Sequence, residues 1–321
     1  MSGINSSLDE IKVSVAMTTY NHEEFIAQAI ESVLMQQTDF EYELIIGEDC
    51  STDQTRNIVQ EYAEKHPNLI KTLLHPHNLG PAHSPGKHNF VSVLEACQGD
   101  YIAILEGDDY WIDPYKLQKQ VEFLEANEDY VLVCANALRT SDQNEFTTAR
   151  LKHIQLGEFD FSIRDLFLRN PVITLTVMFR NYLIKKFPEI FFVSYHGDWP
   201  LYMLLCQYGK GHFMNQVFGV YRSHNHSVIS QYTGQRGIVE LYEHLMNMTD
   251  KWDEYFDYQY HDQVEKYKEK RSREIAEIAV RELWFDRVLL HVGKTDLNKI
   301  TSTRVKLCLA FFRFLSIFLP L

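Results

Sequence analysis

The stretch Ile11-Lys-Val-Ser-Val-Ala-Met-Thr-Thr19 consists mainly of β-branched and small apolar residues. This composition is typical of a strand that is buried within a sheet. Between residues 23 and 36 the apolar side chains return at helical spacing instead, and Asn21 lies near the start of this segment as a cap. The two segments together predict a buried strand that is followed at once by an amphipathic helix.

The same alternation of strand and helix continues along the first third of the chain. Further strands are predicted at 42–47, 69–74 and 100–105, with helices at 51–65 and 88–97 between them. This alternation predicts an α/β fold, in which a mostly parallel sheet is covered by helices on both faces. Later segments add two apolar β-type runs, a helix and a returning strand, at 130–135, 172–179, 199–208 and 212–221.

Polar and acidic residues gather where the predicted strands end. Residues 18–21 end the first strand, 48–53 the second and 106–109 the fourth. The carboxyl ends of parallel strands lie at one edge of a sheet, and folds of this class bind ligands there. The glycine-rich loops GxGxxG and GxxxxGK are both absent from the sequence. We therefore do not expect phosphate to be bound in either of the two ways that these loops provide. We therefore expect a ligand site built from the three clusters.

The composition argues against several classes of protein. The chain has 321 residues, enough for a catalytic domain with an extension, and its formal net charge of −13 argues against a nucleic-acid binder. A nucleotide ligand is compatible with this charge, because a metal ion lets carboxylates hold a diphosphate. The five cysteines are widely spaced without a CxxC pair, so we expect reduced thiols rather than a disulfide framework or a zinc site. The first residues lack the features of a signal peptide.

The pattern changes after residue 230. Residues 231–298 are helix-forming and rich in charged and aromatic residues, which predicts a helical extension. Residues 299–321 carry four basic residues, no acidic residue and many large apolar ones, over a length too short to span a bilayer. They predict a basic amphipathic helix on a membrane surface, with docking on the protein itself or on a partner as the alternative. We therefore expect a catalytic domain at 1–230 and two further parts at 231–298 and 299–321.

Several segments together resemble family 2 of the glycosyltransferases, whose members have the GT-A fold. The likeness covers roughly residues 12–230 and rests on the order and spacing of the segments, because each one alone is weakly specific. In chain order they are Val13-Ser-Val-Ala-Met-Thr-Thr-Tyr-Asn21, Ser32-Val-Leu-Met-Gln36, Glu43-Leu-Ile-Ile-Gly-Glu-Asp-Cys-Ser-Thr-Asp53, Asn78-Leu-Gly80, Gly99-Asp-Tyr-Ile-Ala-Ile-Leu-Glu-Gly-Asp-Asp-Tyr-Trp111, Asp113-Pro-Tyr-Lys-Leu-Gln118, Gly197-Asp-Trp-Pro-Leu201 and Tyr221-Arg-Ser-His224. The resemblance implies an inverting transfer from a nucleotide sugar.

The resemblance places the nucleotide at the first two strand ends. Thr18, Tyr20 and Asn21 lie where the family contacts the base, with the ring of Tyr20 packing on it. Packing of Tyr20 on the next helix is the alternative. Asp49 matches the aspartate that accepts a hydrogen bond from the uracil imide, which implies a UDP-sugar donor. Glu48 and Cys50 depart from the family pattern, which commonly has aspartate and glycine at these positions.

The cluster Glu106-Gly-Asp-Asp109 resembles the DxD metal motif of the family, with glutamate in place of the first aspartate. Neighbouring carboxylates repel one another unless a cation offsets their charge, and Mn²⁺ or Mg²⁺ bound to carboxylate and diphosphate supplies that cation. The resemblance makes Asp108 a ribose or metal contact and Asp109 a metal ligand. It also makes Arg222 a phosphate contact and His224 a metal or phosphate contact. The alternative for residues 106–109 is an acidic turn before a helix.

Asp198 matches the position of the catalytic base in the family. An inverting transfer needs one carboxylate that takes the proton of the acceptor hydroxyl as this hydroxyl attacks the anomeric carbon. The alternative is that Asp198 caps the helix that starts at Trp199-Pro200, and a cap is compatible with a base. Lys87, His88 and Asn89 lie where the family often has an Arg-Asn pair near the donor.

The residues and the resemblance together predict an inverting glycosyltransferase of the hexosyltransferase type. We expect a UDP-sugar donor, a saccharide or lipid-linked acceptor, a divalent metal, and a role in bacterial surface polysaccharide synthesis. The acidic chain with its basic tail fits a cytoplasmic enzyme that contacts the inner face of the membrane peripherally through residues 299–321. The alternatives are a nucleotidyltransferase and a non-catalytic module that binds carbohydrate or nucleotide.

Overall fold

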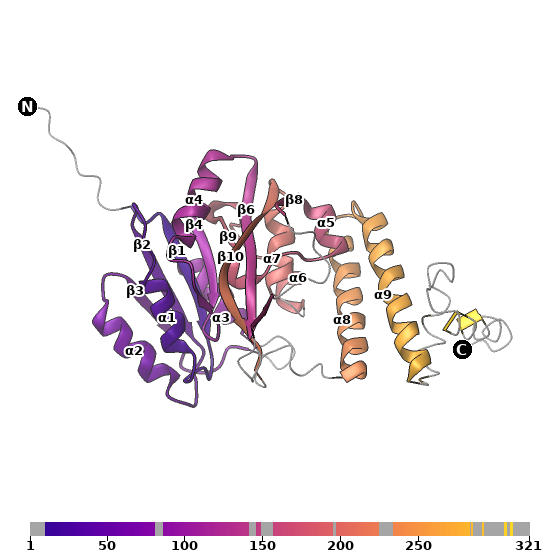
Figure 1. Ribbon diagram of the computed structural model, residues 1–321, viewed down its shortest axis with the longest axis horizontal. Helices are drawn as coiled ribbons and strands as arrows, with labels where there is room; N and C mark the ends of the chain where they lie inside the picture. Colours follow the sequence, from indigo (N-terminus) through magenta and orange to yellow (C-terminus); the bar gives the residue numbers. More distant parts are fainter. Residues whose placement is uncertain are drawn as a thin grey trace, which may run out of the picture. The chain divides into compact units, whose positions relative to one another are not determined.

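The computed structural model describes residues 10–80, 86–140, 146–148, 157–194, 197–224, 234–282, 284, 291, 305–306 and 309–310. The chain divides into two compact units (Figure 1). The first contains the residues up to 166 and residues 170–224, and the second contains residues 167–169 and those from 225 onward.

Four parallel strands form one half of the sheet in the first unit, in the order β3-β2-β1-β4. The strands are β1 (Val13–Thr19), β2 (Tyr42–Glu48), β3 (Ile70–Leu74) and β4 (Tyr101–Glu106). The helices between them are α1 (Ile26–Leu34), α2 (Thr55–Lys65) and α3 (Lys87–Ala96). The register places Thr18 opposite both Gly47 of β2 and Glu106 of β4, so three strands end at the same edge, as the alternation predicts.

The other half of the sheet mixes strand directions. From β4 onward the order is β9-β6-β10-β5, in which β6 and β10 are parallel, while β9 runs antiparallel to its two neighbours and β5 to β10. These strands are β5 (Tyr110–Trp111), β6 (Tyr130–Thr140), β9 (Met178–Arg180) and β10 (Lys210–Arg222). Two short strands, β7 (Phe146–Thr148) and β8 (Phe159–Phe161), pair with β6 and β10. The helices of this half are α4 (Lys116–Ala126), α5 (Ile163–Leu168), α6 (Glu189–Val193) and α7 (Asp198–Leu205).

The run at 172–179, predicted to be β-type, is a strand only at its end. A 3₁₀ turn over Thr174–Thr176 precedes β9. The buried hydroxyl of Thr176 donates to the carbonyls of Ile173 and Ala135, at 2.7 and 3.0 Å, and accepts the amide of Ala135 at 3.0 Å. This side chain therefore satisfies backbone groups that a longer ladder would otherwise have paired.

Helix α1 packs as its apolar spacing predicts. Ile26, Ala29, Ile30 and Val33 recur at helical intervals, and all four are fully buried. Burial of each large aliphatic side chain contributes roughly 1.5–3 kcal/mol. Their partners in the core include alternate residues of β1, namely Val13, Val15 and Met17.

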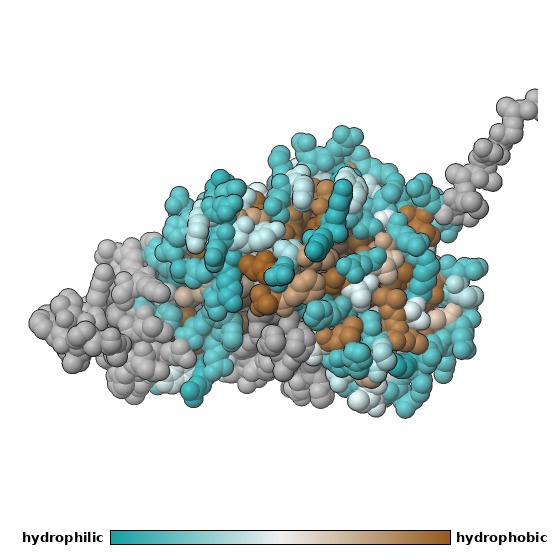
Figure 2. Space-filling model, turned by 180° about the vertical axis from the view of Figure 1, so that it is seen from behind, coloured by the Kyte–Doolittle hydropathy of each residue, from teal (hydrophilic) through white to brown (hydrophobic). Residues whose placement is uncertain are grey.

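Hydrophobic residues also reach the surface on one face of the first unit, between hydrophilic ones (Figure 2).

The start of β4 is tied to β1 and β2 by a buried polar network. The hydroxyl of Ser14 donates to Oε1 of Glu43 at 2.6 Å, and the amide of Gly99 donates to the same hydroxyl at 2.8 Å. Lys71 reaches the second oxygen of Glu43 at 2.7 Å, so this buried carboxylate is paired. A Cβ on Gly99 would lie 2.6 Å from the amide nitrogen of Ser14 and 2.8 Å from the carbonyl carbon of Val13. The chain comes this close to β1 because residue 99 has no side chain.

In the second unit the structure describes the helices α8 (Gly234–Tyr255) and α9 (His261–Arg281), within the stretch predicted to be helical. Trp252 of α8 and Val264 of α9 are fully buried. Asp257 and Tyr258 between the helices have left-handed backbone angles of φ 53° and 60°. The amide of Tyr258 donates to the carbonyl of Asp253 at 2.8 Å, which closes the turn.

Little of the C-terminal segment predicted at 299–321 lies within the described residues. Val305 and Leu309 are buried against Ala276 and Ala279 of α9, which is the packing expected if this segment docks on the protein itself. In the part of the chain that the structure describes, none of the helices is both long and apolar enough to cross a bilayer. The surface helix predicted for this segment, and its contact with a membrane, stay predictions.

We predict that Gly99→Ala destabilises the protein by roughly 1–3 kcal/mol, because the added methyl group meets backbone atoms that have no room to move. Gly157→Ala is the matched control, since a Cβ there meets no atom of the described residues within 4 Å, and it should change stability by less than about 0.5 kcal/mol. Urea denaturation of both variants measures the difference. Equal stabilities would show that β4 does not depend on this close approach.

Candidate active site

The three predicted clusters meet at the carboxyl edge of the sheet and are joined there by backbone hydrogen bonds. The amide of Gly107 donates to the carbonyl of Thr18 at 2.9 Å, and the amide of Asp49 donates to the carbonyl of Thr19 at 3.1 Å. A Cβ on Gly107 would lie 2.7 Å from the hydroxyl oxygen of Thr19. The acidic turn and the end of β1 therefore lie in direct contact.

Asn21 holds two of the clusters together. Its backbone is left-handed, with φ 53°, a conformation that asparagine tolerates better than most residues. Its side-chain oxygen accepts the amide of Thr52 at 2.8 Å, and its own amide donates to the hydroxyl of Ser51 at 3.0 Å. Tyr20 beside it is 42% exposed, so its ring is accessible at the edge, while Thr18 is half-buried. The structure thus brings all three predicted nucleotide residues of the first cluster to this edge.

Asp49 is buried and fixes the next loop. Its Oδ1 accepts the amide of Leu79 at 2.7 Å, and its carbonyl accepts the side-chain amide of Asn78 at 3.1 Å. Burial raises the pKa of Asp49, against the effect of the Leu79 hydrogen bond. Cys50, which follows, is left-handed with φ 60°, a conformation that favours glycine.

Glu48 also turns inward. Its Oε1 accepts the amide of Ser51 at 2.6 Å, and its Oε2 pairs with Arg56 of α2. The side chain is fully buried. The glutamate at this position therefore supports the loop that carries Asp49.

Asp108 lies between two imidazoles. Its Oδ2 is 3.0 Å from Nε2 of His224 and 3.9 Å from Nε2 of His22. Burial works to raise the pKa of Asp108, but the hydrogen bond with His224 and the proximity of His22 outweigh it and hold this pKa below its usual value. The predicted residues Asp108 and His224 are therefore brought into contact.

Asp109 and Arg222 are joined at the end of β10. Oδ1 of Asp109 accepts the backbone amide of Arg222 at 2.8 Å, and Nη1 of Arg222 donates to the carbonyl of Asp108 at 2.6 Å. The guanidinium lies 4.3 Å from the ring centre of Tyr110 and 5.2 Å from that of Phe25. Asp109 is only 2% exposed, and burial raises its pKa. Its assignment as a metal ligand stays a prediction.

Glu106 brings an unsatisfied carboxylate oxygen to the same place. Its Oε2 is buried and has no hydrogen-bond partner among the described residues. Burial, together with the negative charges of Asp108 and Asp198, raises the pKa of Glu106 to about 8. A buried acceptor without a donor is costly, so this oxygen is suited to meet a ligand hydroxyl or a cation.

Asp198 is the first residue of α7, where the helix dipole favours a negative charge. Its Oδ2 accepts the hydroxyl of Thr174 at 3.0 Å, which fixes the carboxylate. Trp199 and Pro200 after it are buried, and Nε1 of Trp199 donates to the carbonyl of Leu166 at 2.9 Å. Asp198 therefore stands on a rigid support, close enough to Glu106 for their charges to interact.

His22 was not identified from the sequence, although it belongs to this cluster. Its Nδ1 lies 3.2 Å from the hydroxyl of Thr19, and its ring meets that of His224 edge-on, with 6.3 Å between the ring centres. Burial lowers the pKa of His22. Its position directly after Asn21, at a strand end already rich in polar residues, is the signal that could have found it.

No three His, Cys, Asp or Glu side chains in the described part of the chain are gathered closely enough to hold a metal ion by themselves. Asp108 and His224 nevertheless form an adjacent carboxylate and imidazole pair, and the buried oxygen of Glu106 lies on the same turn. A divalent ion bound to a nucleotide keeps phosphate oxygens as ligands and needs few from the protein. The residues therefore fit a cation that arrives with a diphosphate.

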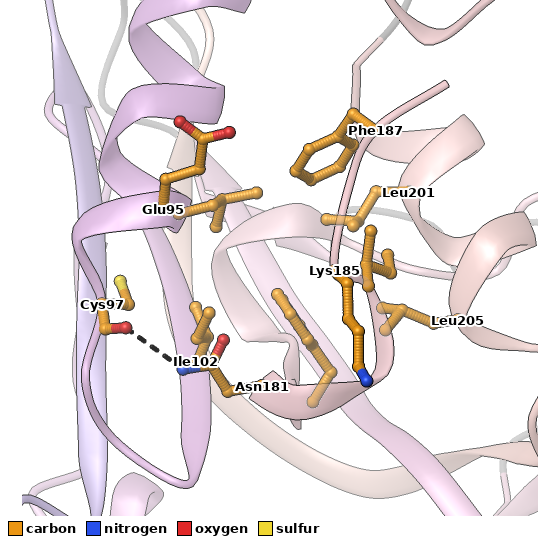
Figure 3. Close-up of a pocket in the computed structure, with 11 residues that line it drawn as sticks. Glu95, Cys97, Ile102, Asn181, Lys185, Phe187, Leu201 and Leu205 are labelled. Atoms are coloured by element: carbon orange, nitrogen blue, oxygen red, sulfur yellow. Dashed lines mark hydrogen bonds between the residues drawn. The ribbon is translucent and has the colours of Figure 1, made fainter.

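A cavity lies at the other end of β4. Its volume is about 220 Å³, and most of the residues that line it are apolar, with Glu95 and Lys185 at its border (Figure 3). Asn181 on its wall donates to the carbonyl of Cys97 at 3.2 Å. Because Ile102 lies near the amino end of β4, this cavity is separate from the acidic edge.

Comparison with known proteins relates the chain to glycosyltransferases. The family model for glycosyl transferase family 2 matches residues 14–191. An uncharacterised protein of Mycobacterium tuberculosis is 33% identical over 238 residues, which are 74% of this chain and 66% of that protein, so just under two thirds of the relative is covered. TarS of Staphylococcus aureus, a poly(ribitol-phosphate) β-N-acetylglucosaminyltransferase, is 34% identical over 126 residues, which are 38% of this chain and 20% of TarS.

Solved structures confirm the predicted GT-A fold. Residues 1–349 of TarS in complex with UDP-GlcNAc match with a TM-score of 0.62 at 18% identity, over 95% of this chain and 88% of that one. The mannosyltransferase PcManGT of Pyrobaculum calidifontis, in complex with GDP-Man and Mn²⁺, matches with a TM-score of 0.56 at 16% identity, over 96% and 81%. At these identities the likeness concerns the fold alone.

We predict that Glu106→Gln stabilises the protein at pH 7.5 but not at pH 5. The pKa of Glu106 in the folded protein is about 8, above its ordinary value of 4.5. As pH rises, the unfolded chain therefore loses the carboxyl proton before the folded protein does. The wild type loses stability between pH 4.5 and pH 8 for this reason. In EDTA the variant should be more stable at pH 7.5 by over ~1.4 kcal/mol, the equivalent of one pKa unit. Urea titrations at both pH values measure this gain. Exposed Glu95→Gln is the control, and a constant difference between wild type and Glu106→Gln would contradict the prediction.

Proposed function

The chain belongs to glycosyl transferase family 2, and on that premise we propose that it transfers a sugar from a UDP-sugar to a saccharide or lipid-linked acceptor with inversion at the anomeric carbon. One observation carries this proposal. The carboxylate of Asp198, fixed by Thr174, stands within charge range of Glu106 at the edge where the strand ends meet. A single base next to an acidic edge that would hold a cation is the arrangement proposed for one in-line displacement.

The proposed preference for a uridine nucleotide rests on residues at the ends of the first two strands. The exposed ring of Tyr20 offers a stacking surface for a nucleobase, and Asp49 offers a carboxylate at the end of β2. The structure of TarS holds UDP-GlcNAc, which supports a uridine donor, whereas that of PcManGT holds GDP-Man. We therefore propose uridine on the residues and treat guanosine as the competing outcome.

The proposed metal is Mn²⁺ or Mg²⁺, held by Asp108 and His224, with Asp109 beside them. The contact between the carboxylate and the imidazole supports this set, and PcManGT is a structural relative with Mn²⁺. When bound, such an ion stabilises the negative charge that develops on the leaving diphosphate. Arg222 would add a positive charge on the same side, since it is fixed between Tyr110 and Phe25.

The proposed reaction then has one bond-making and one bond-breaking event. The acceptor oxygen bonds to the anomeric carbon as the bond from that carbon to the diphosphate oxygen breaks. The proton of the acceptor hydroxyl passes to Asp198, and UDP leaves with its electron pair. The donated hydrogen bond from Thr174 holds the carboxylate in one orientation for this transfer.

The acceptor is proposed to be a bacterial surface polysaccharide or its lipid-linked precursor. Support comes from TarS, whose name states that it modifies poly(ribitol-phosphate). A cytoplasmic location with peripheral membrane contact through residues 299–321 is part of the same proposal. Pelleting with anionic liposomes, with and without these residues, distinguishes membrane contact from docking on α9.

We predict that the purified protein releases nucleoside diphosphate from a UDP-sugar in Mn²⁺ or Mg²⁺, and that EDTA abolishes this release. A panel of UDP-, GDP- and dTDP-sugars, with and without added lipid-linked saccharide, provides the measurement. Asp108→Asn should raise the metal concentration needed for half-maximal rate, because it removes a charged ligand. Release from a GDP-sugar alone would overturn the uridine assignment. Neither release nor binding of any nucleotide sugar would favour the binding-module alternative.

We predict that Asp198→Asn lowers kcat by about 10²–10⁴-fold, the usual contribution of a general base, and leaves the Kd for the donor within about twofold, since the base acts on the acceptor. Asp165→Asn is the matched control, because Asp165 also lies in the first turn of a helix, α5. Steady-state kinetics and donor calorimetry measure both variants. If Asp198→Asn and Asp165→Asn lowered kcat equally, Asp198 would have only a role at the start of its helix.

A further inference from the structure

A buried lysine lies next to the proposed base. Lys87 is the first residue of α3 and only 4% exposed. Its ammonium donates to the carbonyl of Phe191, at 2.9 Å, and to that of Ser194. It also lies 5.5 Å from the centre of the Phe191 ring. The side chain is thus turned toward the end of α6, although its neighbourhood in the sequence suggested a position near the donor.

The two carbonyls lie at the end of α6, where the helix dipole favours a positive charge. Burial lowers the pKa of Lys87 to about 8, against the effect of the negative charge of Asp198. Carbonyl oxygens and a nearby carboxylate help to compensate an ammonium in such a place for the lost water.

Lys87 lies beside Ser194 at the end of α6 and beside Gly197 just before α7. It binds Ser194 on one side, and on the other its Cε lies 3.7 Å from the point where a Cβ on Gly197 would be. Asp198 follows Gly197 directly, and its charge acts on Lys87. The lysine therefore joins the start of α3 to the backbone that immediately precedes the proposed base.

We propose that Lys87 is a positioning residue for Asp198: it fixes the end of α6 and the start of α7, so that the carboxylate stands at one place relative to the acidic edge. The inference rests on the proposed role of Asp198. It assigns Lys87 to the acceptor side of the reaction, through Asp198, rather than to the phosphates of the donor.

The test compares Lys87→Met, which keeps the apolar stem and removes the ammonium, with Lys87→Arg, which keeps a cation. We expect Lys87→Met to lower kcat by about 10–100-fold, as a displaced catalytic group does, with the donor KM and Kd within about twofold. Lys87→Arg should recover part of kcat. In an Asp198→Asn background the Lys87→Met change should have almost no further effect, because the residue acts through the base.

Lys116→Met is the matched control for the loss of a buried ammonium. Lys116 of α4 is also fully buried, with its ammonium 2.8 Å from Oε1 of Gln120 and 4.1 Å from the centre of the Trp111 ring. Both methionine variants should melt at lower temperature than the wild type, so kinetics are measured well below either transition. Lys87→Met alone should lose kcat.

Hydrogen exchange provides a readout that does not need turnover. The amides of Phe191, Ser194 and Leu201 are hydrogen-bonded within this region, and Lys87→Met should speed their exchange more than that of β1 amides. Unchanged exchange, or an unchanged kcat, would overturn the positioning role, and a loss of donor affinity equal to that of kcat would assign Lys87 to the donor instead. A wild type without turnover would refute the proposed function, while exchange would still decide whether Lys87 holds this segment.

Discussion

Three carboxylates on one turn, those of Glu106, Asp108 and Asp109, have to be kept together although their negative charges repel one another. The structure offsets the repulsion differently at each residue. Asp108 is held ionised by His224, Asp109 accepts a backbone amide from the end of β10, and Glu106 favours its neutral form. The distant strand β10 is thereby attached to β4 through the acidic turn.

The parallel half of the fold was predictable because its elements are long and periodic. Helix α1 and strands β1, β2 and β4 agree with their predicted positions to within a few residues. The antiparallel strands β5, β7, β8 and β9 have two or three residues each, too few for any periodicity to appear. At β9 the preceding turn is decided by the hydroxyl of Thr176, a tertiary contact that a local pattern does not contain.

The location of the candidate site was predictable, but the contacts and roles of its individual residues were less so. Strand ends that carry acidic residues must converge in a parallel sheet, which is why Asp49, Asp108 and Asp109 could be named together. The sequence did not indicate that Asn21 bridges two loops, that Glu48 pairs with Arg56, or that His22 faces Asp108. Each depends on a backbone direction or a partner that is distant in the chain. Lys87 is the clearest case, because two of its partners, Phe191 and Ser194, are more than a hundred residues away.

The contact of Gly107 with Thr19 also limits how relatives of this chain can diverge. A side chain at residue 107 would meet the hydroxyl of Thr19 at 2.7 Å and the ring of His22 at 3.1 Å. A descendant that acquires alanine or serine there must therefore change residue 19 or 22 in compensation, or let the acidic turn shift away from β1. Substitutions in these two motifs, some 90 residues apart, are therefore expected to depend on one another.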